Sequence, residues 1–223
     1  MSTDLVVMLT NNDQTVGNAI EVFDDCKDLA VKFWGFKDIG LPVEQMKKLV
    51  YKMKEAEKIT CLEVVSYSEE ECLAAAKLAE ECKFDYLMGT IFYEKVFDYI
   101  KDKPIKYTPF CGKVSGNPSI LEGSIEEIIQ EAKDLEKFEV DGFDLLAYRY
   151  VGDAEELARE FVREVNVPVC IAGSIDSYER IDFINEIKPW SITMGSALFK
   201  SKFVKDGTFR DNLQNVMEYM GIR

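Results

Sequence analysis

The chain has 223 residues, of which 47% are apolar, and this suits one large domain with a sizeable core. Forty-one acidic residues against 27 basic ones give a net charge of −14, which argues against nucleic acid and anionic membranes as partners. Histidine is absent, which excludes the commonest metal ligand and every Ser–His or Cys–His nucleophile. The sequence therefore predicts no bound metal and no cofactor, and acid–base chemistry must use Lys, Glu, Asp, Tyr or Cys.

The six cysteines predict a reducing compartment. None of them forms a C-x-x-C pair, and several fall on predicted strands or apolar helix faces, where a free thiol acts as a small hydrophobe. No signal peptide and no apolar run long enough to span a bilayer are found. We therefore expect a cytoplasmic protein.

Strand-like and helical patterns alternate along the whole chain. Eight apolar runs are predicted as strands: residues 5–10, 30–36, 59–66, 85–92, 105–113, 143–150, 168–175 and 191–199. A helical pattern follows each of them: residues 15–29, 42–58, 68–83, 94–101, 124–138, 153–166, 177–187 and 208–220. Several of these helices open on a capping residue, as at Ser68 with Glu71 and at Ser124 with Glu127.

Eight strand–helix units at even spacing predict an α/β fold, a single (β/α)8 barrel covering residues 1–223. A doubly wound sheet normally has five or six strands, so it fits the pattern less well. The longest break covers residues 112–123 and is rich in Gly, Ser, Asn and Pro. It lies on the side where active sites of barrels form, so it is a candidate lid.

Two late turns carry the strongest indication of a ligand. Residues 171–175 (IAGSI) and 193–199 (TMGSALF) each run from an apolar strand through Gly-Ser into a helical pattern. In a (β/α)8 barrel, the loops after strands 7 and 8 commonly hold phosphate on backbone N–H groups. Tight strand-to-helix turns also favour small residues without any ligand. We predict that Gly173, Ser174, Gly195 and Ser196 bind a substrate phosphate.

Ionisable residues in or just after the predicted strands are the candidates for catalysis. Barrel strands are buried on both faces, so a charged group there needs a partner or a function. Glu63 lies within the third strand and is expected to point into the barrel. Lys37 and Asp38 close the second strand, Lys113 the fifth and Arg149 the sixth. These five residues are predicted to form a ring of charges at the barrel mouth.

Each of these residues also has a purely structural interpretation. Glu63 could be the buried ion-pair partner of Lys32 or Lys37. The polar residues 11–13 after the first strand are typical of any turn, and Asp144 is expected to pair with a helix or loop. Tyr148 and Tyr150 are interpreted as packing residues or pocket walls.

Residues 169–175 (VCIAGSI) and 192–199 (ITMGSALF) resemble the ribulose-phosphate-binding type of phosphate-binding barrel. That superfamily includes the histidine-biosynthesis isomerase and cyclase and several sugar-phosphate epimerases. The resemblance implies a phosphate role for Gly173, Ser174, Gly195 and Ser196. The rest of the chain departs from known members: strand 1 has no catalytic Asp, the metal-binding histidines of the pentulose epimerase are missing, and so is the Asp-x-Lys-x-x-Asp motif of the decarboxylases.

These patterns favour a metal-independent isomerase or epimerase that acts on a small phosphorylated metabolite, such as a sugar phosphate. Glu63 and either Lys37 or Lys113 would be the acid–base pair. One alternative is a class I aldolase in which Lys113 or Lys37 forms a Schiff base. Another is a non-catalytic sensor of a phosphorylated ligand, as in barrels that resemble the glycerol-operon antiterminator. The sequence leaves a homo-oligomer open.

Overall fold

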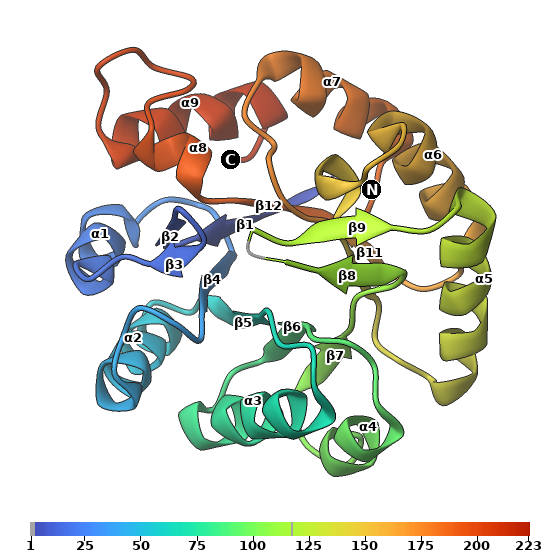
Figure 1. Cartoon of the computed structure of the whole chain (residues 1–223). Helices are drawn as coiled ribbons and strands as arrows, with labels where there is room; N and C mark the ends of the chain where they lie inside the picture. The colour runs from blue at the N-terminus through green and yellow to red at the C-terminus, as the bar shows by residue number, and fades with distance from the viewer. Residues whose placement is uncertain (1–2, 117) are drawn as a thin grey trace.

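The computed structural model describes residues 3–116 and 118–223. Eight parallel strands form one sheet in the order β10-β11-β12-β1-β4-β5-β6-β7, which confirms the predicted (β/α)8 barrel (Figure 1). The strands are β1 (Asp4–Met8), β4 (Phe33–Lys37), β5 (Ile59–Val64), β6 (Tyr86–Gly89), β7 (Lys106–Thr108), β10 (Phe143–Leu145), β11 (Val169–Ile171) and β12 (Ser191–Met194). The N–H groups of Asp141 and Asp144 donate to the carbonyls of Tyr107 and Pro109, and these bonds close the ring between β7 and β10.

Helices surround the strands in chain order (Figure 1). They are α1 (Ala19–Cys26), α2 (Val43–Glu55), α3 (Glu69–Cys82), α4 (Glu94–Ile100), α5 (Ile125–Leu135), α6 (Ala154–Glu164), α7 (Tyr178–Ile187), α8 (Ser196–Phe199) and α9 (Phe209–Met220). The predicted capping boxes at the starts of α3 and α5 are both present, because Ser68 and Ser124 each exchange hydrogen bonds with the glutamate three residues on. Among the described helices, none has the length and apolar character needed to cross a bilayer.

The core has two parts. The larger lies between the strands and the helices, and a smaller cluster fills the inside of the barrel. At the N-terminal end of the strands, Phe33 and Tyr86 pack on Trp190 with ring centroids 5.5 and 5.4 Å from it. These rings close that end, so the carboxyl ends of the strands are left for a site. All six cysteines are free and buried, as the sequence predicted.

Several predicted elements end or begin at other residues in the structure, and four of them bear on the site. Strand β7 ends at Thr108 because Pro109 has no N–H to continue the ladder. Strands β10 and β12 are also shorter than expected, and their last residues instead form the 3-10 helix η2 (Ala147–Arg149) and the helix α8. Helix α1 begins four residues late, because a hairpin of β2 (Thr10–Asn11) and β3 (Gln14–Thr15) precedes it.

The candidate lid contains a second hairpin, made of β8 (Lys113–Ser115) and β9 (Ile120–Glu122). Asn117, within this segment, lies outside the described residues. The hairpin is held on one side by the Tyr150 hydroxyl, which donates to the carbonyl of Gly123 over 2.8 Å. On the other side, the Tyr67 hydroxyl donates to the carbonyl of Gly116 over 2.8 Å. Closure of this hairpin over the site stays a prediction.

Candidate functional site

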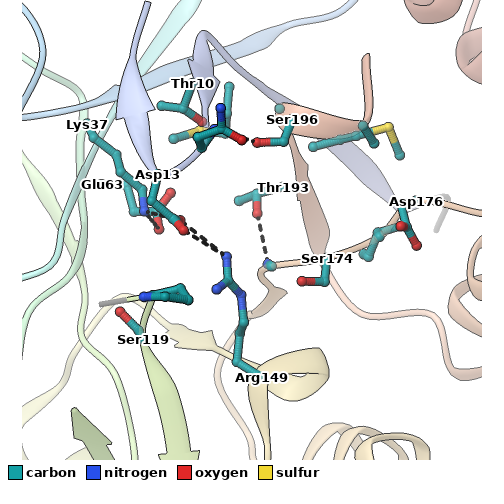
Figure 2. A pocket seen from close by; sticks show the side chains of 18 of the residues that line it. Thr10, Asp13, Lys37, Glu63, Ser119, Arg149, Ser174, Asp176, Thr193 and Ser196 are labelled. Carbon is teal, nitrogen blue, oxygen red and sulfur yellow. Dashed lines mark hydrogen bonds and ion pairs between the residues drawn. The ribbon is translucent and has the colours of Figure 1, made fainter. Parts of the chain in front are cut away.

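A cavity of about 410 Å³ opens at the carboxyl ends of the strands (Figure 2). Residues from widely separated parts of the chain line it together. They include Thr10, Asp13, Lys37, Glu63, Ser119, Arg149, Gly173, Ser174, Asp176, Thr193, Gly195, Ser196, Lys200 and Lys202. The structure therefore brings seven of the nine predicted site residues to one cavity.

The Lys37 ammonium lies between two carboxylates. Its Nζ atom is 3.0 Å from Oδ1 of Asp13 and 3.5 Å from Oε1 of Glu63. The parallel register of β4 and β5 pairs Lys37 with Glu63, so both side chains leave neighbouring strands on the same face. Both side chains are less than a tenth exposed. A buried ion pair of this kind is either structural or functional, and its position at the strand ends in the cavity favours function.

Asp13 joins this cluster to Arg149. The Arg149 Nη2 atom is 3.2 Å from Oδ1 of Asp13, on the opposite side from Lys37 (Figure 2). Burial raises the pKa of Asp13, but the charges and hydrogen bonds of Lys37 and Arg149 lower it by more, and the net shift is downward. Asp13 is therefore ionised at neutral pH. We call Asp13, Lys37, Glu63 and Arg149 the charged cluster; its two cations and two carboxylates sum to zero.

The same carboxylates govern the titration of Lys37. Burial lowers the pKa of Lys37, yet the charges of Glu63 and Asp13 and the hydrogen bond from Lys37 to Asp13 raise it by more. The net pKa lies above the usual range of lysine. Lys37 is therefore an ammonium group at neutral pH.

The turn between β2 and β3 delivers Asp13 to the charged cluster. Asn12 and Asp13 have φ angles of 50° and 61°, and this is the left-handed region that two-residue hairpins require and that Asn and Asp tolerate. The Thr15 hydroxyl donates to the Lys37 carbonyl over 2.7 Å and accepts from the Lys37 N–H over 2.9 Å. This pair of bonds fixes the hairpin to the end of β4. The prediction of a turn at residues 11–13 is correct, but it missed that Asp13 pairs with Lys37 and Arg149. The available signal was an Asn-Asp pair directly after the first strand.

The two Gly-Ser turns form the other wall of the cavity (Figure 2). Gly173 has a φ of 79°, and its N–H donates to the Thr193 hydroxyl over 3.4 Å. Ser196 begins helix α8, and its hydroxyl accepts from the Asn12 N–H over 3.1 Å. The turns after β11 and β12 therefore lie side by side, as the sequence predicted, and hydroxyl groups and backbone face the cavity between them.

Gly195 has a structural reason of its own. A Cβ atom at this position would lie 2.8 Å from the carbonyl oxygen of Thr10 and 2.9 Å from that of Met8. Backbone atoms cannot move aside as a flexible side chain can, so only glycine fits. The alternative that small residues serve tight packing is therefore correct at Gly195, and a bulky substitution there would test the fold as well as binding.

Two lysines that sequence reasoning missed, Lys200 and Lys202, also line the cavity. Lys200 follows helix α8, and Lys202 lies two residues further on. The Lys202 Nζ atom is 3.7 Å from Oδ2 of Asp176, which also pairs with Arg180 over 2.8 Å. Their sequence position, just after the second Gly-Ser turn, was the signal that could have found them.

Two predicted residues do not line this cavity. Lys113 is exposed on β8, opposite Glu122 of β9, because the strand that was expected to carry it ends at Thr108. The structure does not bring Lys113 to Lys37 and Glu63, so the expected third member of the ring is missing. Asp38 follows Lys37 but lines a neighbouring cavity instead.

Asp144 was expected to pair with a helix or a loop, and this is wrong. Asp144 lies opposite Cys170 in the register of β10 and β11, and Cys170 belongs to the cluster inside the barrel. It is fully buried, and neither carboxyl oxygen has a hydrogen-bond partner within the described residues. Burial and then the charge of Glu63 raise the pKa of Asp144 far above its usual range, although Lys37 lowers it. Asp144 is therefore an uncharged acid inside the barrel.

The described residues include no group of three or more His, Cys, Asp or Glu side chains arranged to hold a metal ion. Independence from metals stays a prediction, because it concerns the activity.

No protein-family model matches the sequence, and no curated protein sequence matches it. Solved structures share the fold. Orotidine 5'-monophosphate decarboxylase from Methanocaldococcus jannaschii superposes with a TM-score of 0.72 over 99% of each chain at 15% identity. N-(5'-phosphoribosyl)anthranilate isomerase from Pyrococcus furiosus gives a TM-score of 0.65 at 11% identity, over 97% of this chain and 99% of the isomerase. The glycerol uptake operon antiterminator regulatory protein from Listeria monocytogenes gives 0.60 at 15% identity, over 86% of this chain and 91% of the regulator.

The decarboxylase and the isomerase are ribulose-phosphate-binding barrels, which confirms the resemblance of the fold. Their names denote enzymes of phosphorylated compounds, whereas the third neighbour is a regulatory protein. At identities of 15% or less, these likenesses show the fold of the chain alone.

Proposed function

We propose that this protein is an enzyme that moves a proton next to a carbonyl group of a small phosphorylated metabolite, as an isomerase or an epimerase. One observation carries the proposal. The Lys37 ammonium and the Glu63 carboxylate, 3.5 Å apart, line the same cavity as the Gly-Ser turns after β11 and β12. An anion-binding wall and an acid–base pair thus face one space, which is what such a reaction needs.

The substrate phosphate would bind at the two turns. Gly173 allows backbone to approach an anion closely, and the hydroxyls of Ser174 and Ser196 can donate to it. Lys200 and Lys202 add positive charge at the same wall, in a chain whose net charge is −14. In (β/α)8 enzymes, phosphate commonly binds at this place, beside a short extra helix such as α8.

Glu63 would be the base. Its carboxylate would remove a proton from the carbon next to the carbonyl group, and the C–H electron pair would form the double bond of an enediolate. The Lys37 ammonium would stabilise the negative charge that develops on the carbonyl oxygen. Isomerisation follows if Glu63 gives the proton to the neighbouring carbon while the hydroxyl proton moves to the former carbonyl oxygen. Epimerisation follows if the Lys37 ammonium gives its own proton to the opposite face of the same carbon, after which the proton held by Glu63 reprotonates Lys37.

The titration of Lys37 supports proton transfer over the aldolase alternative. A Schiff base forms only from a neutral amine, and the two carboxylates beside Lys37 hold its pKa above the usual range. Lys113 is exposed, so it lacks the desolvation that activates such a lysine.

Exchange with solvent deuterium tests the proposal. Aldose and ketose phosphates of different chain lengths are incubated with the protein in D2O and followed by proton NMR. We expect the proton next to the carbonyl group of one of them to disappear with the wild type and to persist with Glu63→Gln. Covalent trapping of a substrate on Lys37 by borohydride would contradict the proposal. So would phosphate binding without any exchange, which favours the sensor.

A further inference from the structure

A second cavity, of about 510 Å³, lies beside the first. Asp13, Lys37 and Ser119 line both cavities, so two members of the charged cluster lie between them. The rest of the second cavity is formed by the residues after β4, the loop after β5, one face of α3 and Gly116. A group that reacts at Lys37 can therefore extend to either side.

The body of the second cavity is apolar. Val65, Ala75 and Leu78 form its wall, and Ile39 lies at its rim with 47% of its surface exposed. An apolar wall with a small number of polar groups is typical of small-molecule sites.

Three carboxylates line this cavity: Asp13, which pairs with Lys37 and Arg149, Glu71, which belongs to the capping box of α3, and Asp38. Asp38 is half-buried, and its carboxylate has no side-chain hydrogen bond or ion pair among the described residues. Burial raises the pKa of Asp38, since water solvates its charge poorly there. The Tyr67 hydroxyl is already engaged with Gly116 and with Ser119, 2.9 Å away. Asp38 is therefore the acceptor that remains for a ligand.

The charges of the two cavities differ in sign. Three basic side chains (Arg149, Lys200 and Lys202) and two acidic ones (Glu63 and Asp176) line the first cavity only, whereas the two acidic side chains Asp38 and Glu71 line the second only. An elongated molecule with a phosphate at one end and hydrogen-bond donors at the other would match both.

We propose that the second cavity binds the non-phosphate end of the substrate, and that this end is a hydrocarbon or ring body with a hydroxyl or ammonium group that donates to Asp38. The inference rests on the proposed function and narrows its substrate class. The substrate would be an elongated, two-ended phosphate monoester rather than a three-carbon phosphate, with its reacting carbon at Lys37.

Calorimetric binding of defined probes tests this inference. The probes are inorganic phosphate, glycerol phosphate, a hexose phosphate, its amino-sugar counterpart and its sugar-acid counterpart. We expect the hexose and amino-sugar phosphates to bind at least about tenfold more tightly than the first two, since a hydrogen bond to a charged group contributes that much. The sugar-acid phosphate should bind no more tightly than inorganic phosphate or glycerol phosphate, because its carboxylate would face the carboxylate of Asp38.

Two variants on α3 locate the effect. Ala74 is exposed and lines the second cavity, so Ala74→Trp should fill it without disturbing the core. Lys77→Trp is the matched control, exposed on the same helix but not part of the lining. Ala74→Trp should abolish the gain of the extended probes and leave binding of inorganic phosphate unchanged, and Lys77→Trp should retain the gain.

Asp38→Asn examines the polar contact. It should weaken binding of the amino-sugar phosphate about tenfold and leave inorganic phosphate unaffected. If inorganic phosphate binds but the extended probes gain nothing, or if Ala74→Trp weakens all probes equally, this inference is overturned while the proposed function stands. If inorganic phosphate does not bind at all, the proposed function itself fails.

Discussion

The two walls of the first cavity are built differently. The wall after β11 and β12 consists of backbone and small side chains from two short turns, and Ser174 in it is exposed. The opposite wall consists of the charged cluster, whose four side chains come from a hairpin, two strands and η2. In the proposed function, the first wall binds the substrate phosphate without breaking an ion pair of the charged cluster. In the second wall, each charged side chain already has a partner, so a substrate must take the place of one partner in an ion pair before it can bind there.

The largest effect is expected at the base. Glu63→Gln should lower turnover by about two to four orders of magnitude, because the amide cannot remove a proton. It is nearly isosteric, so the melting temperature should change little. Rate and melting curve are measured on the same preparation, with the exchange reaction as the assay. A loss of stability that matches the loss of rate would mean that Glu63 is only the structural partner of Lys37.

Lys37 and Lys113 form a matched pair for a test of stability. Lys37→Met leaves Asp13 and Glu63 without their shared cation, and breaking a buried pair in this way costs about 3–5 kcal/mol. Lys113→Met changes an exposed residue and should stay within about 0.5 kcal/mol of wild type. Urea denaturation at neutral pH measures both. If both variants lost the same free energy of unfolding, the ion pairs of Lys37 would contribute no more to stability than an exposed lysine does.

Asp144 makes the stability depend on pH. Its pKa in the folded protein lies above that in the unfolded chain. Below about pH 4 the carboxyl is protonated in both states, so Asp144 does not change the free energy of unfolding there. As the pH rises further, the unfolded chain releases this proton and the folded one keeps it, which destabilises the wild type by up to about 1.4 kcal/mol per pH unit.

Asp144→Asn should therefore gain stability relative to wild type as the pH rises from 4 toward neutrality. Glu63 and Lys37 are the charged groups that act on Asp144, so the double variant with Glu63→Gln serves as the control. Parallel curves for wild type and Asp144→Asn, from thermal unfolding at several pH values, would show that Asp144 ionises like an ordinary carboxyl.

Ser174 tests the wall of backbone and small side chains. Ser174→Asp places a negative charge where phosphate is proposed to bind, and affinity for inorganic phosphate should fall about tenfold or more. Ser174→Asn is the neutral control, and both residues tolerate the positive φ of 57° at this position. Isothermal titration calorimetry measures the affinity of both variants for inorganic phosphate. Equal affinities would contradict phosphate binding at this turn.

The smallest effect is expected from metal removal. Exhaustive dialysis against EDTA should leave both folding and turnover unchanged, because the charged cluster supplies both the base and the positive charge. Turnover that is lost and then restored by Mg²⁺ would indicate that a carboxylate-bound ion takes part at Glu63 or Asp38.

The sequence misjudged residues wherever a strand ended earlier than its apolar run. Lys113 belongs to such a run, but Pro109 ended the ladder and the chain turned into a hairpin. Arg149 was expected at the end of a strand and lies on η2, yet it still reaches Asp13. Apolar periodicity records burial, and residues just beyond a barrel strand are buried as well.

What the sequence determined by itself is local: the alternation of strands and helices, the capped helix starts and the two Gly-Ser turns, each readable within a few residues. Only the tertiary structure decided that Asp13 would meet Lys37 and Arg149, across 24 and 136 positions of the chain, and that Asp144 would face the inside of the barrel. The hydrogen bonds of helices and their caps, and the periodicity of apolar residues, act between near neighbours, so they leave a record in the sequence. Ion pairing depends on which strand ends the closed barrel brings together, and no local pattern encodes that.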